Sequence, residues 1–192
     1  MASWCLAFAL ALGLLLPAQD GLAQQGRQST ASVSTAATLS ILAGIVHRIP
    51  AGGSRLQAAD DGMDLAEGDR IVTWPKAAAL ITFPDGSTVA TQPNSDVTIK
   101  KADLGGGKSS AISMQIHFGA VWARVVRRPD PKSSFSLESP TATATAHSGL
   151  IGGQLTEDGS FACWTRAGAL TVKDPGGRTL LTLPPNETTT LQ

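Results

Sequence analysis

The chain has 192 residues, of which 42% are apolar and 16% are charged. Fifteen basic and fifteen acidic side chains give a formal net charge of zero, which leaves no strong field for binding nucleic acid or an anionic membrane. This composition excludes a coiled coil and a wholly disordered chain, and the length is that of one domain.

The first segment has the pattern of an export signal. Residues 2–17 carry no charge and contain an apolar run of about a dozen residues, which is too short for a spanning helix. Small residues at Gly21 and Ala23 predict cleavage after Ala23, so residues 1–23 are interpreted as a signal peptide. We therefore expect a periplasmic or secreted protein with no stable membrane span, the alternatives being a retained anchor or a misplaced start codon.

The remaining chain divides into a linker and a β domain. Residues 24–37 consist mainly of Ser, Thr, Ala and Gln, so they are predicted to form a flexible linker. Residues 38–192 show short runs of period-two alternation separated by Gly, Pro, Asp and Asn, with no long helical stripe. This pattern predicts one all-β domain, either solenoid-like or a two-layer β-sandwich of short strands and hairpins. Glycines that open apolar strands recur along it and favour stacked β-units: Gly44, Gly68, Gly119 and Gly168.

A hairpin is predicted in segment 79–91. Pro84-Asp85-Gly86 suits a three-residue loop with Gly86 in the left-handed conformation. That loop pairs Phe83 with Ser87 and keeps Ile81 and Val89 on one face, whereas a two-residue loop would place them on opposite faces. A second strand is predicted at 111–118, with alternate residues facing the core: Ile112, Met114, Ile116 and Phe118.

The sequence offers no catalytic, cofactor-binding or metal-binding pattern. Segment 102–109 resembles a phosphate loop, but a strand follows where a helix is needed, so it is interpreted as a hairpin loop. The acidic segment 60–69 lacks the spacing of a calcium loop and is interpreted as a solvated turn. His47, His117 and His147 are not spaced as a metal site, and no serine lies in a nucleophile-elbow motif. We therefore expect no enzymatic activity and no cofactor.

Cysteine and tryptophan complete the apolar pattern. Cys163 alternates in phase with Phe161 and is predicted to face the core, as the single cysteine left after cleavage. The tryptophans beyond the signal have two interpretations, core packing because aromatic residues are few, or partner binding: Trp74, Trp122 and Trp164.

A basic cluster follows the strand that contains Trp122: Arg124, Arg127, Arg128 and Lys132. Its simplest interpretation is a charged strand end that discourages edge-to-edge association. The functional interpretation is a docking surface for an acidic partner or envelope polymer. The candidate partner-binding residues are Trp122, Arg124, Arg127, Arg128 and His147.

Several segments, taken in order, resemble the FecR domain of exported bacterial proteins. The most specific are LAEGDRIVT at 65–73, ALITFPDGS at 79–87, GAVWARV at 119–125 and FSLESPTA at 135–142. The resemblance covers about residues 39–185 and implies an all-β, solenoid-like periplasmic sensor or interaction domain. In well-known members this domain follows one transmembrane helix, contacts the signalling domain of a TonB-dependent receptor and relays iron–siderophore uptake to a sigma factor.

The sequence departs from that plan in three places. An export signal stands where those regulators have a cytoplasmic segment, no further C-terminal subdomain is expected, and the usual V-R-G-T stretch reads Ala146-His147-Ser148-Gly149. We therefore expect a stand-alone exported FecR-like domain that binds an envelope protein, by resemblance a receptor or membrane regulator, and no nucleic acid. The alternative is a structural or carbohydrate-binding module of the cell envelope or surface matrix, with a glycan as its ligand.

Overall fold

The computed structural model describes residues 35–104, 109–127 and 129–192, and the regular structure in these ranges consists of β-strands. The predicted all-β class is therefore confirmed. The predicted signal peptide and residues 24–34 of the predicted linker lie outside the described residues. The first strand begins at Ala37, and Ala36 and Ala37 are buried, so the sheet starts slightly before the boundary expected at residue 38.

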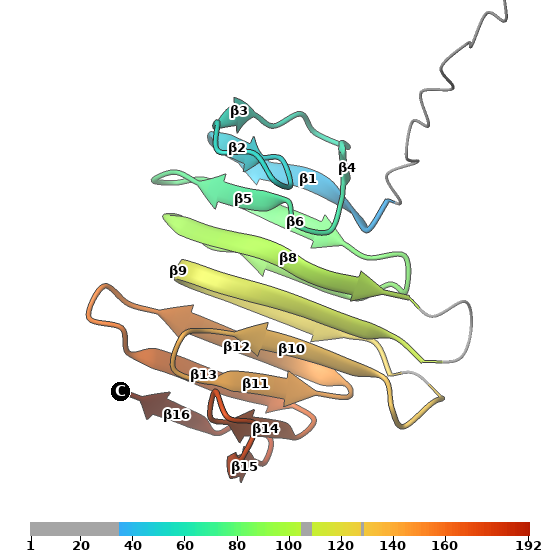
Figure 1. The fold of residues 1–192 in the computed structure, drawn as a ribbon, viewed down its shortest axis with the longest axis vertical. Helices are drawn as coiled ribbons and strands as arrows, with labels where there is room; N and C mark the ends of the chain where they lie inside the picture. Colours follow the sequence, from blue (N-terminus) through green and yellow to red (C-terminus); the bar gives the residue numbers. More distant parts are fainter. Residues whose placement is uncertain (1–34, 105–108, 128) are drawn as a thin grey trace, which may run out of the picture. The chain divides into compact units, whose positions relative to one another are not determined.

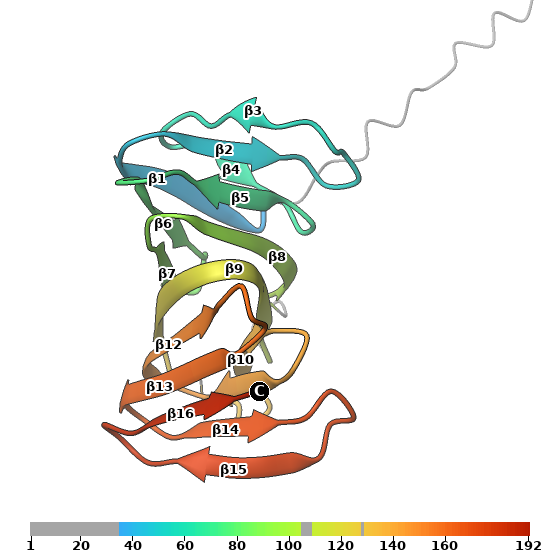
Figure 2. The same cartoon turned by 90° about the vertical axis from the view of Figure 1, so that its left-hand side faces the viewer.

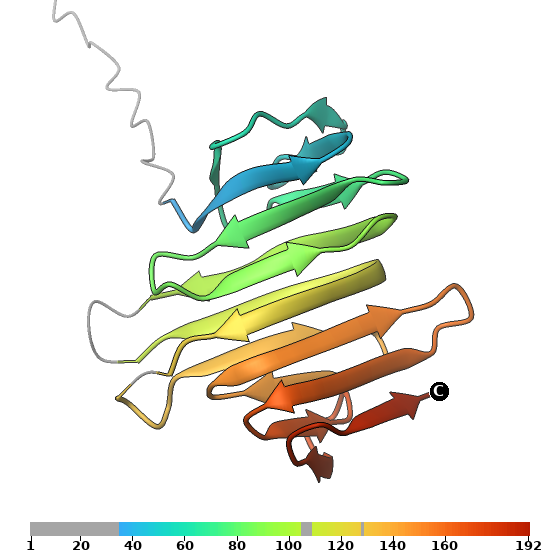
Figure 3. The ribbon, with the colours of Figure 1, turned by 180° about the vertical axis from the view of Figure 1, so that it is seen from behind.

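The strands form two facing layers that share one long strand, β9 (Ala111–Val125). Figure 3 looks onto the first layer and Figure 1 onto the second. The first layer has the order β4 (Asp64–Leu65), β1 (Ala37–Ala43), β6 (Ala78–Thr82), β7 (Thr88–Thr91), β9, β12 (Gly149–Leu155), β13 (Phe161–Ala167) and β16 (Thr188–Leu191). The second has the order β3 (Gln57–Ala58), β2 (Val46–Ile49), β5 (Arg70–Thr73), β8 (Ser95–Asp103), β9, β10 (Ser134–Glu138), β11 (Thr143–Ala146), β14 (Leu170–Lys173) and β15 (Thr179–Leu183). All these pairs are antiparallel except that of β9 with β10, which is parallel.

Strand β9 crosses from one layer to the other at Gly119. Its first half pairs with β8 and β10, and its second half pairs with β7 and β12. Gly119 has a φ of +84°, and a Cβ there would lie 2.5 Å from the backbone oxygen of Asn94, so a larger residue would not fit. The bend shifts the alternation of inward-facing and outward-facing residues along β9. Ile116 and Val121 are both buried although they are an odd number of positions, five, apart. It also corrects the expectation for Phe118, which lies at the bend and is only half-buried.

The glycines noted in the sequence lie at similar corners. Gly44, Gly68 and Gly168 have positive φ angles, and each stands between a strand of the first layer and a strand of the second. The recurrence of glycine in the sequence therefore corresponds to the places where the chain passes between the layers.

The predicted hairpin is formed by β6 and β7, and it is confirmed in register. Ile81 lies opposite Val89, and the Phe83 N–H donates to the Ser87 carbonyl at 2.9 Å. Gly86 has a φ of +84°, as the three-residue loop requires. The expected hairpin at segment 102–109 also has paired flanks, because Asp103 lies opposite Ala111. Residues 105–108 lie outside the described residues.

The core lies between the two layers. Phe83 and Phe135 meet edge to face across it, with ring centroids 6.3 Å apart. Cys163 faces inward as predicted and is fully buried, and this burial raises the pKa of its thiol to about 12. The largest fully buried side chains are Phe83, Phe135, Phe161, Leu39, Leu65, Ile71, Ile81, Ile99, Met114, Ile116, Leu137 and Ile151.

The acidic segment 60–69 is not wholly a solvated turn, because Asp69 is fully buried. Its carboxylate accepts hydrogen bonds from the backbone N–H groups of Ala51 and Ala66, at 2.9 and 2.8 Å, and from Arg48. The distance from the Arg48 guanidinium to the nearer Asp69 oxygen is 2.8 Å. Burial of this carboxylate is tolerated because it is fully hydrogen-bonded and paired. Asp69 thus joins two loops rather than facing water.

Candidate binding face on the first layer

Two tryptophans meet on the outer surface of the first layer. Trp122 on β9 and Trp164 on β13 both lie opposite Gly152, which is on the strand between them. Their ring centroids are 5.2 Å apart with an interplanar angle of 65°, an edge-to-face arrangement. Both side chains are partly exposed, so the interpretation of these residues as core packing is wrong for this pair. Phenylalanines fill the core instead.

Gly152 is what allows the indoles to meet. A Cβ at this position would lie 2.2 Å from Cε2 and 2.3 Å from Nε1 of Trp164, so the ring rests directly on the glycine backbone. This packing covers the Nε1 atom, which is buried and has no hydrogen-bond partner among the described residues. An indole N–H that is buried without an acceptor costs free energy, so the packing of Trp164 on Gly152 must offset this cost.

Each tryptophan is followed two positions later by an arginine on the same face. Alternation along β9 places Arg124 on the same face as Trp122. Arg166 stands at a register shift between β12 and β13, and it is exposed beside the half-buried Trp164, whereas Thr165 between them is buried. Strands β9 and β13 both run antiparallel to β12, so the two Trp-x-Arg motifs point in the same direction. Leu150, which is 37% exposed, lies opposite Arg124. We call this surface the Trp–Arg face: Trp122, Arg124, Leu150, Gly152, Trp164 and Arg166.

The two arginines carry unpaired charge. Both are exposed, and neither has an ion pair or hydrogen bond within the described ranges. An arginine beside an aromatic ring combines a planar donor group with a flat apolar surface, and this pair of residue types dominates binding energy at protein interfaces. The Trp–Arg face therefore suits a ligand that has an acidic group next to an apolar or ring-shaped one.

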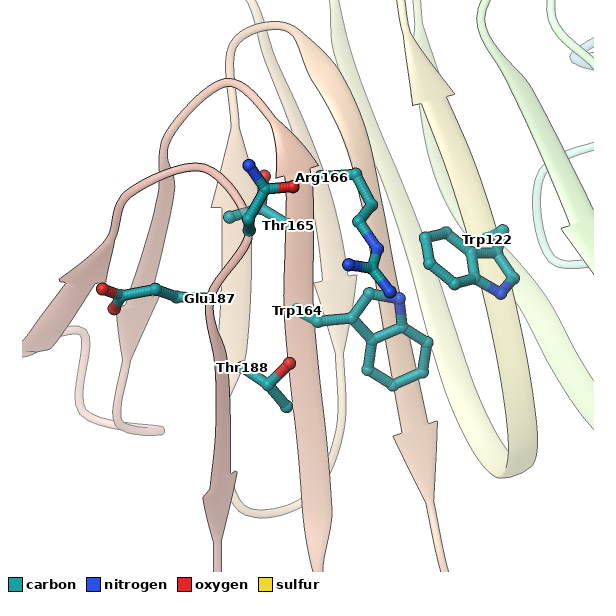
Figure 4. A pocket seen from close by; sticks show the side chains of 7 residues that line it. Trp122, Trp164, Thr165, Arg166, Glu187 and Thr188 are labelled. Atoms are coloured by element: carbon teal, nitrogen blue, oxygen red, sulfur yellow. The ribbon is translucent and has the colours of Figure 1, made fainter.

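A pocket of about 230 Å³ adjoins the Trp–Arg face. Figure 4 shows the Arg166 side chain reaching toward the Trp164 indole on one side of it. The opposite wall is the loop between β15 and β16, which is held to β13 because the Asn186 N–H donates to the Thr165 carbonyl at 2.7 Å. The pocket is lined by Trp122, Trp164, Thr165, Arg166, Asn186, Glu187 and Thr188.

The structure brings together only some of the residues that the sequence singled out. Trp122 and Arg124 share the Trp–Arg face, whereas Arg127 is exposed beyond the end of β9. Arg128 lies outside the described residues. His147 lies between β11 and β12, and its Nδ1 is 2.6 Å from the carbonyl oxygen of Ser133, so it belongs to a different surface.

Sequence reasoning raised Trp164 only as one of three tryptophans with two open interpretations, and it did not assign Arg166 or Gly152 to the site. A signal for the first two was present, because Phe161 and Cys163 facing inward require Trp164 and Arg166 to face outward. Gly152 had no such signal, because its role depends on the register of three strands. The described residues hold no cluster of three or more His, Cys, Asp or Glu side chains placed to bind a metal ion. They also contain no helix of the length and apolarity needed to cross a membrane.

Comparisons with known proteins agree with this fold. The family model described as FecR protein matches residues 69–170, more than half of the chain. Two crystal structures of a candidate anti-sigma factor from Parabacteroides distasonis ATCC 8503 superpose with a TM-score of 0.52 at 20% sequence identity. The match covers 64% of this chain and 54% of that one, so the chain spans about half the length of the solved protein. None of the curated protein sequences matches this chain.

Proposed function

The chain belongs to the FecR family, and from that membership we propose that it is a non-enzymatic regulatory sensor module that binds another protein of the bacterial cell envelope. The module acts after export, in the periplasm or beyond it. Its partner is a receptor or a membrane-bound regulator, and the Trp–Arg face is the surface that the partner contacts.

The observation that carries this proposal is the alignment of the two Trp-x-Arg motifs on one outward face. Two exposed arginines, Arg124 and Arg166, lie beside a pair of indoles without any acidic partner in the described chain. Such charges remain hydrated in the free protein, and an acidic segment of a partner would pair with them while an apolar side chain covered the rings. The first layer supplies a hydrogen-bonded base, because both tryptophans lie within paired strands.

The test is photo-crosslinking in intact cells from the edge of the Trp–Arg face. A photoreactive residue at Thr188, which is exposed and lines the adjoining pocket, is compared with one at Thr182, which is exposed on β15 of the second layer. We expect one envelope protein to be captured from Thr188 and not from Thr182. Equal capture from both positions, or capture of no envelope protein, would remove the proposal.

A matched pair of arginine variants sharpens this test. The double variant Arg124→Ala, Arg166→Ala is expected to lower capture by about tenfold or more, because interface arginines commonly contribute well over 1 kcal/mol. Arg55→Ala is the control, because Arg55 is exposed in a loop outside the face. Retained capture in the double variant would show that the arginines do not bind the partner.

A second candidate function is glycan binding at the same surface. The pocket beside Trp164 combines aromatic rings with hydroxyl, amide and guanidinium groups, a set that suits the apolar face and hydroxyl edge of a sugar ring. Co-sedimentation with purified peptidoglycan or exopolysaccharide tests it. Binding that is lost in Trp164→Ala and kept in Trp74→Ala would favour the glycan, and failure of the wild-type protein to co-sediment would remove it.

A further inference from the structure

Exposed apolar residues lie at one corner of the domain, away from the Trp–Arg face. Leu42 is 59% exposed, Ile45 is 62% exposed and Trp74 is 47% exposed, three of the six most exposed large apolar residues described. Leu42 lies near the end of β1, Ile45 lies in the connection from β1 to β2, and Trp74 lies in the connection from β5 to β6. Figures 1 and 2 show these two connections on the same side of the domain. The backbone N–H of Trp74 donates to the backbone carbonyl of Ile45 at 3.2 Å, and this hydrogen bond joins the two connections. We call residues 42–45 and 74–76 the apolar corner.

Close packing and hydrogen bonds hold the corner in place. Gly44 has a φ of +67° and packs against Ala77, where a Cβ would lie 2.7 Å from the Ala77 Cα. The Trp74 indole N–H donates to His47 Nδ1 at 2.9 Å, and the two rings meet edge to face. This bond satisfies the polar atom of Trp74 within the protein. The indole can therefore enter an apolar medium without leaving an unpaired donor.

The chemistry of the corner matches a lipid–water interface. Its residues are Leu-Ala-Gly-Ile and Trp-Pro-Lys, so it holds no carboxylate and one cation, the exposed Lys76. Tryptophan is favoured at the boundary between lipid and water, and a lysine beside apolar residues can reach the headgroups. Because Ile45 and Trp74 project from connecting turns and Leu42 from the strand end beside them, a fluid bilayer can accommodate them more readily than a preformed protein pocket could.

We propose that the apolar corner inserts into the interface of a lipid bilayer and holds the domain at a membrane surface. The proposal is independent of the proposed function, because the Trp–Arg face lies on β9, β12 and β13, toward the other end of the first layer from β1 (Figure 3). Docking through the corner leaves that face open to a partner. Since the chain has zero net charge, apolar insertion rather than long-range attraction drives binding, and the dependence on salt is weak.

Vesicle binding tests the proposal with variants of exposed residues. The predicted exported form, which begins at Gln24, is used because the apolar run at 2–17 would itself bind lipid. The buried core lies within residues 36–183 and is kept whole. Vesicles of phosphatidylethanolamine and phosphatidylglycerol are expected to co-sediment with the wild-type protein. The double variant Leu42→Ser, Ile45→Ser should lower binding by about tenfold or more. Leu180→Ser, at a 41% exposed leucine of β15, is the control and should bind normally.

Quenching by brominated lipids locates the inserted residue. The tryptophan fluorescence of the wild-type protein should be quenched on binding. Trp74→Phe should remove this quenching, and it should keep vesicle binding because phenylalanine is also apolar. Trp164→Phe should leave the quenching in place. The proposal is overturned if the wild-type protein does not co-sediment, if Leu180→Ser weakens binding as much as the double variant does, or if quenching persists in Trp74→Phe. Sedimentation that shows a dimer abolished by the double variant would instead assign the corner to contact between copies, and would also overturn it.

Discussion

Replacing Gly152 by alanine is expected to separate the two tryptophans of the Trp–Arg face. The new methyl group would lie 2.2–2.5 Å from three atoms of the Trp164 indole, so the ring must move away from β12 and from Trp122. The loss of the edge-to-face contact costs about 0.5–1.5 kcal/mol. Uncovering roughly 50 Å² of apolar surface adds about 1 kcal/mol. Alanine recovers about 0.5–1 kcal/mol of the backbone cost of glycine in a strand.

The net expectation for Gly152→Ala is a loss of about 1–2 kcal/mol in the free energy of unfolding, together with loss of the near-ultraviolet circular dichroism of the coupled indoles. Gly153→Ala is the matched control, because its methyl group would enter the core 3.1–3.2 Å from Ile116, Leu137 and Phe161. It should also destabilise through overpacking while keeping the indole signal. An unchanged indole signal in Gly152→Ala would refute the packing of Trp164 on this glycine.

Three further outcomes are expected in urea unfolding. Gly119→Ala should lower the free energy of unfolding by about 3 kcal/mol or more, because its Cβ would meet backbone atoms at a positive φ. Gly159 also has a positive φ but open space around it, so Gly159→Ala should lower it by only about 1–2 kcal/mol. Equal losses in the two variants would contradict the role of Gly119 as a corner. Asp69→Ala should lower the free energy of unfolding by about 3–5 kcal/mol, because it leaves Arg48 and two backbone N–H groups without their acceptor. A loss below about 1 kcal/mol would show that the buried carboxylate is dispensable. Burial raises the pKa of the Cys163 thiol from 9.0 to about 12, so the thiol of the unfolded chain ionises first as the pH rises. The free energy of unfolding should therefore fall by up to about 1.4 kcal/mol per pH unit between those two values. Cys163→Ala should abolish this slope, and a slope that persisted in the variant would belong to another group.

The sequence determined those features whose cause is local. Alternation of apolar and polar residues specified the all-β class and the inward position of Cys163, because the side-chain period of a strand is two. The loop Pro84-Asp85-Gly86 specified its own hairpin register, because a shorter loop would have placed Ile81 and Val89 on opposite faces. The motifs that resemble FecR led to the family that the comparison then showed.

Only the tertiary structure decided which distant residues meet. Trp122 and Trp164 are 42 residues apart in the sequence. They share one surface because β12 pairs with both of their strands and places Gly152 between them. Asp69 looked like part of a solvated turn, and became a buried junction because Arg48 and the backbone of Ala51 come from another part of the chain. Strand pairing between distant segments depends on register and layer assignment, which are set by packing of the whole core rather than by any one segment. For this reason the sequence could suggest the binding residues singly, while the face that they form required the fold.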